Sequence, residues 1–342
     1  MSPIDPAESC WLAPRDGHRV WWHAEGNPQA PAVLLVHGGP GGRTREESIA
    51  PWRGTGLSII AFDQRGCGRS EPLGETAANT LDALVDDMEG VRAAAGVERW
   101  ALAAGSWGAR LALAYAVRHA ERVSALWLRS PFVGSLAETR RYVGPWRAWL
   151  GESGRAWLGE ATVDAVRSLY HDLRPAVGDD TGLSRGVLPP LFDSVHLALA
   201  WSAFDDAQSL PGGAKASGAR CDVARLAAAV ADRRRGSPAA QALAGWRVHA
   251  IHALRRWGTD DALEGAWPEA RALARRWQGP VEIVAGCDDA TCDPQVALQL
   301  ANVLPDARCH LMPGAGHRMS DERLVPGLAT AARALAARLG FN

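Results

Sequence analysis

Short hydrophobic runs alternate with amphipathic segments in the first third of the chain. The residues between the runs have helical periodicity, and Asn79 and Thr80 are side chains that can cap a helix start. Short apolar strands separated by helices are typical of a parallel sheet covered by helices. We expect strands at residues 19–22, 32–36, 57–62, 100–103 and 123–128, and helices at residues 80–95 and 107–119.

The pattern changes near residue 132 and returns near residue 278. The intervening residues form successive helical segments rich in Trp, Arg and Ala, which Gly and Pro interrupt. Alternation then resumes with strands at 281–285 and 307–311 and helices at 294–303 and 324–339. The sequence therefore predicts one mostly parallel sheet domain, made of residues 1–131 and 278–342, with a helical cap domain of residues 132–277 inserted into it.

The composition limits the class of partner. The 342 residues carry a formal net charge of -1, and 22% of them are charged. This balance favours neither a nucleic acid nor a membrane as a partner, so we expect a small peptide or small-molecule substrate. The six cysteines lack the paired spacings of a zinc site or a disulfide framework. Because the chain has no secretory start and no run of about 18 apolar residues, we expect a cytoplasmic protein.

One turn has the pattern of a nucleophile elbow. The apolar run that begins at Trp100 continues into Ala104 and Gly105, followed by Ser106, Trp107 and a helix. Small residues are needed on both sides of such a serine because the turn is strained and crowded by the strand and the helix. Ala104 stands where the usual motif has its first glycine. A serine in such a turn is ordinarily only a turn residue, so the rest of the sequence must decide whether Ser106 is catalytic.

The rest of the sequence supplies an acid and a base in the right order. Asp289 follows the strand predicted at 281–285, and His317 follows the strand predicted at 307–311. In hydrolases with this elbow the chain order is serine, acid, histidine, with the acid and the base after late strands. Taken singly, His317 would be a loop histidine and Asp289 a turn or cap residue. Together with Ser106 they predict a catalytic triad.

A glycine-rich loop lies where an oxyanion hole belongs. Residues 37–42, directly after the strand at 32–36, contain one histidine, four glycines and a proline. Such a loop contributes one backbone N–H to the oxyanion hole, and the residue after the nucleophile contributes another. We assign these donors to Gly39 and Trp107. A phosphate-binding loop is the alternative, but its terminal Lys and Ser/Thr are replaced by Arg43 and Thr44.

With these residues in place, the chain resembles the proline iminopeptidase family, serine exopeptidases of the α/β-hydrolase fold. The resemblance spans nearly the whole chain. It rests on Cys292, Pro294 and residues 37–42, 62–70, 79–80, 105–108, 128–129, 200–202, 286–289 and 316–317.

The resemblance implies a mechanism. Ser106 attacks the scissile carbonyl, His317 takes its proton and passes it to the leaving group, and water hydrolyses the acyl-enzyme. The family pattern places the acid on Asp289 rather than on Asp288 or Asp293. No metal or organic cofactor is required. His249 and His252 have a spacing compatible with a metal, but no third ligand is apparent, so we predict no metal site.

The resemblance is weakest at the substrate. Family members hold the free amine of the substrate with glutamates of the cap, and the first of these positions corresponds to Asp205. The second falls near His249, where no carboxylate is present, and Asp206 and Glu264 are the acids that would replace it. We therefore expect Asp205, Trp201 and His249 to contact the substrate. The amine clamp is weaker than in the family.

Three classes of function follow from these residues. The first is release of an N-terminal amino acid, proline or a related residue, from a short peptide or a peptide-like metabolite. The second is an esterase, amidase or acyltransferase that acts on a specialised small molecule, because the same triad serves those reactions. The third is a non-catalytic ligand-binding protein, which retention of all three triad residues disfavours. The sequence leaves the oligomeric state open.

Overall fold

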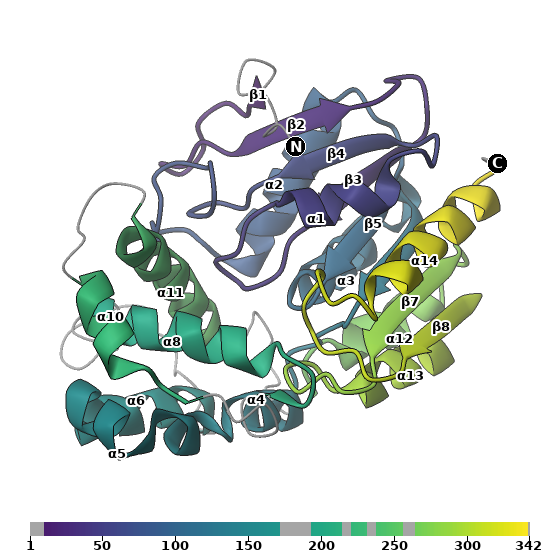
Figure 1. The fold of residues 1–342 in the computed structure, drawn as a ribbon. Coiled ribbons are helices and arrows are strands. Elements are labelled where there is room, and N and C mark those ends of the chain that lie inside the picture. Colours follow the sequence, from purple (N-terminus) through teal and green to yellow (C-terminus); the bar gives the residue numbers. More distant parts are fainter. Residues whose placement is uncertain (1–9, 172–192, 214–219, 231–236, 256–263, 341–342) are drawn as a thin grey trace.

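The central feature of the fold is one twisted sheet. The computed structural model describes residues 10–171, 193–213, 220–230, 237–255 and 264–340. In these residues eight strands pair in the order β1-β2-β4-β3-β5-β6-β7-β8 (Figure 1). The β1–β2 and β2–β4 pairs are antiparallel and the others are parallel. The strands are β1 (Cys10–Trp11), β2 (Trp21–Glu25), β3 (Ala32–Val36), β4 (Ser58–Phe62), β5 (Trp100–Gly105), β6 (Val123–Arg129), β7 (Val281–Gly286) and β8 (Ala307–Met312).

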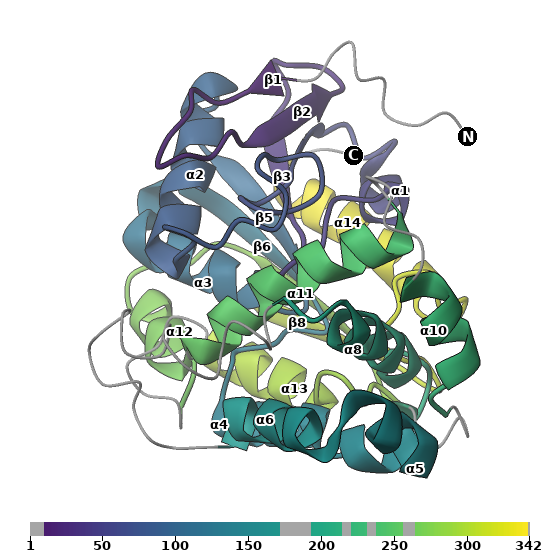
Figure 2. The same ribbon diagram turned by 90° about the vertical axis from the view of Figure 1, so that its left-hand side faces the viewer.

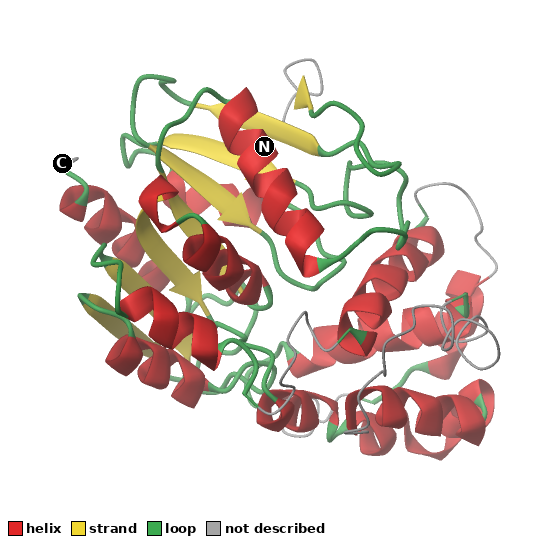
Figure 3. Cartoon of the chain, turned by 180° about the vertical axis from the view of Figure 1, so that it is seen from behind, coloured by secondary structure: helices red, strands yellow, loops and turns green. Residues whose placement is uncertain are grey.

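Helices cover both faces of this sheet (Figure 3). Along β5 the side chains alternate, so Leu102 belongs to the hydrophobic cluster that includes residues of α2, α3 and α13, whereas Ala103 belongs to the cluster that includes α14 and Trp52. Thr80 caps α2, as predicted, with its hydroxyl accepting a hydrogen bond from the amide of Ala83. The helices of the sheet domain are α1 (Glu46–Ile49), α2 (Leu81–Ala94), α3 (Gly108–Arg118), α13 (Pro294–Val303) and α14 (Val325–Arg338), with 3-10 turns η2 (Ala50–Trp52) and η3 (Ala120–Arg122).

The chain between β6 and β7 is helical. Most of its helices gather to one side of the sheet, where α11 and α8 pack against each other (Figures 1 and 2). They are α4 (Leu136–Val143), α5 (Trp146–Leu158), α6 (Glu160–His171), α8 (Val195–Gln208), α10 (Val223–Val230) and α11 (Pro238–Leu254). The last helix before β7, α12 (Trp267–Ala274), packs instead against α3 of the sheet domain. No helix in the described ranges is long and apolar enough to cross a membrane.

Helix α11 contacts the loop after β3 through backbone atoms. A Cβ atom added to Gly41 would lie 2.3 Å from the carbonyl oxygen of Gly245, which is on α11. Gly41 has φ +88°, a conformation that glycine adopts without strain. Only glycine at position 41 permits this approach, so the helix and the loop are in direct contact.

A buried ion pair holds the segment after β4 against α2. Arg65 donates from Nε and Nη2 to the carboxylate of Asp87 at 2.7 and 2.6 Å, and from Nη1 to the carbonyl of Ala78 at 2.8 Å. The exposed fractions of the Arg65 and Asp87 side chains are 0% and 3%. Asp16, at 3.6 Å from Nη1, is itself half exposed and offers Arg65 only a weak second partner.

We expect Asp87→Ala to lower the free energy of unfolding by about 3–5 kcal/mol, because it leaves the buried Arg65 guanidinium without its bidentate partner. Equilibrium unfolding in urea measures this change. Asp82→Ala is the matched control, since Asp82 lies on the same helix with 85% of its side chain exposed, and its loss should stay below about 1 kcal/mol. Equal losses of unfolding free energy in the two variants would show that the buried Arg65–Asp87 pair contributes no more to stability than an exposed one.

Candidate active site

Ser106 lies in a strained turn between β5 and α3. Its φ is +55°, a left-handed conformation that is unusual for any residue other than glycine. Its amide donates a hydrogen bond to the carbonyl of Arg129 at 2.9 Å, and its carbonyl accepts one from the amide of Phe132 at 3.1 Å. The turn thus projects the Ser106 side chain from the carboxyl edge of the sheet, as a nucleophile elbow does.

Glycines let the loop after β3 lie against this turn. A Cβ atom on Gly38 would be 2.7 Å from the carbonyl oxygen of Gly105, and one on Gly108 would be 2.4 Å from that of Val36. Both distances are shorter than a Cβ atom tolerates. Ala104, by contrast, is fully buried in the core on the face with α2 and α3, where its methyl group packs. The departure from the first glycine of the motif is therefore accommodated.

His317 and Asp289 form a hydrogen-bonded pair. His317 Nδ1 lies 2.8 Å from Asp289 Oδ2, and Oδ1 accepts hydrogen bonds from the amides of Thr291 and Cys292 at 2.9 and 2.8 Å. Burial by itself would raise the pKa of Asp289, but the positive charge and hydrogen bond of His317 and the amide of Cys292 hold that pKa below its usual value. Asp289 is therefore a carboxylate, which orients the imidazole with Nε2 away from the acid.

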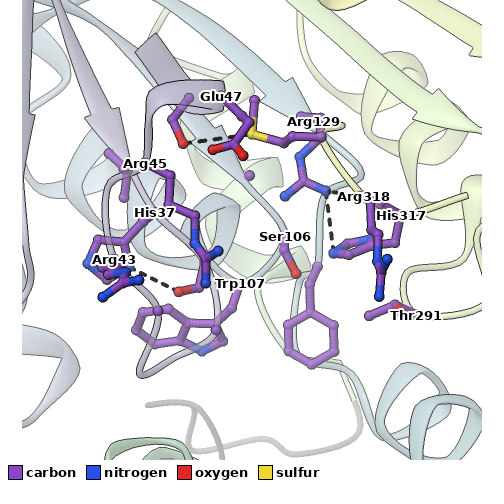
Figure 4. Close-up of a pocket in the computed structure, with 18 of the residues that line it drawn as sticks. His37, Arg43, Arg45, Glu47, Ser106, Trp107, Arg129, Thr291, His317 and Arg318 are labelled. Carbon is purple, nitrogen blue, oxygen red and sulfur yellow. Dashed lines mark hydrogen bonds between the residues drawn. The ribbon is translucent and has the colours of Figure 1, made fainter. Parts of the chain in front are cut away.

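Ser106 and His317 both line the same cavity (Figure 4). Within the described chain, the recorded contact of Ser106 Oγ is with Cys292 Sγ at 3.7 Å, and His317 Nε2 lies 3.4 Å from Arg129 Nη1. A serine–histidine hydrogen bond is not among the described hydrogen bonds. Hydrogen bonds between a catalytic serine and histidine are often long before substrate binds, so this geometry is compatible with His317 acting as the base for Ser106.

The two amides assigned to the oxyanion hole both belong to residues that line the cavity. Among the turn and loop hydrogen bonds of the described residues, none is donated by the backbone N–H of Gly39 or Trp107. The loop and the elbow that carry them are in contact, because Gly38 packs on Gly105 and Ser106. Their role as oxyanion donors stays a prediction.

Residues of the helical segment between β6 and β7 complete the cavity, which has a volume of about 560 Å³. Asp205 lines it and accepts a hydrogen bond from the Tyr142 hydroxyl at 2.6 Å. The surrounding protein raises the pKa of Asp205 by desolvation. His249 also lines the cavity, and burial lowers its pKa to about 3, so the imidazole is neutral.

Asp206, also named from the sequence, lines the cavity, whereas Trp201 and Glu264 do not. Trp201 is not in the cavity lining: it is 4% exposed and packs on Tyr142 and His249, with ring centroids 5.6 and 5.1 Å away. Glu264 forms an ion pair with Arg271 and also lies outside the lining. Trp201 therefore supports the residues of the cavity wall from behind.

His252 points away from the cavity. Its Nε2 lies 3.1 Å from Asn79 Oδ1, and burial lowers its pKa to about 3. In the part of the chain that the structure describes, no group of three or more His, Cys, Asp or Glu residues is arranged to hold a metal ion.

Tyr142 and Arg129 are among the cavity residues that were not assigned a role from the sequence. Tyr142, from α4, reaches Asp205 of α8, and Arg129, at the end of β6, reaches His317. The position of Arg129 could have been predicted from the sequence, because β6 pairs with β5 and the last residue of β6 must lie beside the elbow. No comparable signal exists for Tyr142, because the helices of the cap must be packed before it can be placed.

Comparison with known proteins agrees with this geometry. The model of the alpha/beta hydrolase fold family matches residues 31–324. The chain belongs to the α/β-hydrolase fold family. The sequence prediction of fold class is thereby confirmed, including the mostly parallel sheet.

Several relatives of this α/β-hydrolase carry the name proline iminopeptidase. That of Neisseria gonorrhoeae is 40% identical over 149 residues, which are 44% of this chain and 46% of that protein. The match thus spans less than half of the relative's length. A probable proline iminopeptidase of Leptolyngbya boryana is 28% identical over 330 residues, 95% of this chain and 93% of that protein.

A solved structure is similar over almost its whole length. The crystal structure of proline iminopeptidase from Mycobacterium smegmatis aligns with a TM-score of 0.55 and 21% identity, covering 96% of this chain and 98% of that one. At this identity the similarity establishes the fold alone.

Proposed function

We propose that this α/β-hydrolase is a serine hydrolase in which Ser106 is the nucleophile, His317 the general base and Asp289 the orienting acid. The observation that carries the proposal is the His317–Asp289 hydrogen bond of 2.8 Å in the cavity that Ser106 also lines. The left-handed turn at Ser106 and the adjoining glycine loop support it.

The chemistry follows from these positions. Ser106 Oγ attacks the scissile carbonyl while His317 Nε2 takes its proton, and the amides of Gly39 and Trp107 stabilise the oxyanion. His317 then protonates the leaving group, and an acyl-enzyme on Ser106 remains. Water attacks this ester with His317 again as base and regenerates the serine. Asp289 keeps the proton of the imidazole on Nδ1 throughout.

The proposed reaction is release of an N-terminal proline or a related residue from a short peptide or peptide-like metabolite. The names of the relatives support this substrate class. A buried ammonium needs a carboxylate, and Asp205 and Asp206 both line the cavity. Asp206 takes the place of the second acid missing at His249, although Arg318 Nη2 lies 3.4 Å from it. The helices within residues 132–277 form the cap over the cavity.

Three substrates separate the candidate reactions: a prolyl arylamide with a free amine, its N-acetylated counterpart and a simple aryl ester. We expect the wild type to cleave the free-amine arylamide, and Ser106→Ala to lose that activity. Ester cleavage without prolyl release would contradict the peptidase and favour an esterase, amidase or acyltransferase. Absence of turnover on all three would favour a binding protein.

Asp205→Asn should lower kcat/KM for the free-amine arylamide by roughly 10–100-fold, because a hydrogen bond to a charged group is worth about 1.5–3 kcal/mol. Cleavage of an ester without an amine should change by less than about threefold, since its carbonyl does not need Asp205. Asp164→Asn, on the exposed surface of α6, is the matched control. Equal losses of kcat/KM on the arylamide and the ester would show that Asp205 does not bind the amine.

A further inference from the structure

Arg129 is a buried cation without a carboxylate partner among the described residues. It is 7% exposed and lines the cavity at the end of β6. Both recorded hydrogen bonds come from Nη1, to the carbonyl of His317 at 2.7 Å and to His317 Nε2 at 3.4 Å. The Nε atom is buried and has no acceptor there. Buried guanidinium groups are ordinarily paired with an anion, so this one is unusual.

The nearest acid does not supply the missing anion. Both oxygens of the Asp289 carboxylate are engaged, Oδ2 by His317 and Oδ1 by the amides of Thr291 and Cys292. The ion pairs of the described chain do not include one between Asp289 and Arg129. Arg129, which lines the cavity, therefore has a hydrogen-bond donor, Nε, that no group of the described site accepts.

The position of Arg129 relates it to the leaving group. Its guanidinium points toward His317 (Figure 4), whose Nε2 must protonate the leaving nitrogen. In a dipeptide the free α-carboxylate is one carbon atom away from that nitrogen. A leaving residue bound beside Nε2 thus brings its carboxylate to the guanidinium.

The same cavity is also lined by residues from the face of the sheet that α14 covers. This part, the second arm, is lined by Leu35, Ser48, Trp52, Ala103, Trp127 and Met319. Four of these residues belong to the hydrophobic cluster of the α14 face, and the rings of Trp52 and Trp127 meet edge to face at 5.5 Å. Leu35, Trp52, Ala103 and Trp127 make this part of the wall apolar, although Ser48 and the exposed carboxylate Glu47 also line the cavity. The acids proposed to bind the amine, Asp205 and Asp206, belong instead to the segment between β6 and β7.

We propose that the second arm binds the leaving residue of the substrate, with Arg129 pairing with its free α-carboxylate and the apolar part of the wall accepting its side chain. The preferred substrates are then dipeptides with an apolar C-terminal residue. A cavity of about 560 Å³ suits a ligand of this size. This inference rests on the proposed aminopeptidase function and specifies its substrate.

The first test compares prolyl-leucine, prolyl-leucinamide and a prolyl arylamide by release of proline. Wild type should show a kcat/KM for the free acid that exceeds the amide by about 10–100-fold, since the amide leaves a buried charge unpaired. Arg129→Gln should abolish this ratio, and Arg129→Lys should retain part of it. The ratio is informative because a misplaced His317 would slow all substrates alike. Arg333→Gln, exposed on α14, is the control.

The second test measures binding without turnover. Isothermal titration calorimetry compares 3-phenylpropionate with 3-phenylpropanamide, which differ only in the carboxylate. The carboxylate should bind wild type and Ser106→Ala at least about tenfold more tightly than the amide, and Arg129→Gln should remove the difference. Equal binding of the two ligands, or equal cleavage of acid and amide in an active enzyme, would overturn the inference. Carboxylate selectivity without prolyl release would refute only the proposed aminopeptidase reaction.

Discussion

Ser106→Ala should reduce turnover by roughly 10⁴–10⁶-fold, because the covalent step has no other nucleophile and only binding and the oxyanion donors remain. Steady-state kinetics on the prolyl arylamide measures this loss, and a fluorophosphonate probe reports the same serine by covalent labelling. The substitution removes one hydroxyl whose recorded contact is the weak one with Cys292. The circular dichroism spectrum and Tm should therefore stay close to those of the wild type.

A control variant makes this result decisive. Ser202→Ala, at an exposed position on α8, should retain labelling and turnover. Labelling that persists in Ser106→Ala would place the nucleophile elsewhere. Cys292 is the neighbour to examine in that case, but burial raises the pKa of its thiol well above the usual value, and a protonated thiol is a poor nucleophile.

Asp289→Asn should reduce kcat by roughly 10⁴-fold. An asparagine has no charge to stabilise the imidazolium, and its side-chain amide favours the wrong tautomer of His317. Its carbonyl can still accept from the amides of Thr291 and Cys292, which now bind Oδ1. We therefore expect a folded but nearly inactive protein, assayed by kcat on the arylamide and by thermal unfolding.

The adjacent acids are matched controls for that variant. Asp288 is exposed, and Asp288→Asn should keep full activity. Asp293 is occupied otherwise, because it caps α13 through the amide of Gln295 and lies 3.3 Å from Arg141. Full activity in Asp289→Asn would reassign the acid to one of these positions.

The sheet and the residues at its carboxyl edge were predictable from sequence. Central strands such as β3 are buried on both faces and read as uninterrupted apolar runs, and β3 and α13 coincide with the predicted ranges. Ser106, Asp289 and His317 lie in the turns and loops that follow β5, β7 and β8. Their encounter in space follows from strand order alone, because the ends of parallel neighbours meet at one edge.

The edge of the sheet was harder to predict. Strand β2 covers Trp21–Glu25 rather than residues 19–22, and the two-residue β1 and the short α1 were not predicted. An antiparallel edge strand is defined by its partner more than by its own residues, so local sequence constrains it weakly. Two residues also carry no periodicity from which a strand could be inferred.

The helical segment between β6 and β7 was even harder to predict from local sequence. A tryptophan at position 201 was expected in the pocket, but whether it faces the cavity depends on how α8 packs on α4 and α11. In the structure Tyr142 and Asp205 line the cavity instead, and their hydrogen bond joins residues 63 positions apart in the chain. Helix orientation in a cap is decided by packing across such separations, and single-sequence patterns do not encode it.

The backbone contact between Gly41 and Gly245 restricts how this enzyme can evolve or be redesigned. Any side chain at position 41 would collide with α11, and a shift of α11 would displace the neighbouring loop that carries Gly39. Changes of substrate range made through this part of α11 are therefore expected to displace Gly39, a predicted oxyanion donor, and to lower the rate on every substrate. Mutational libraries aimed at new specificities are better directed to the residues of α8 and α4 that line the cavity.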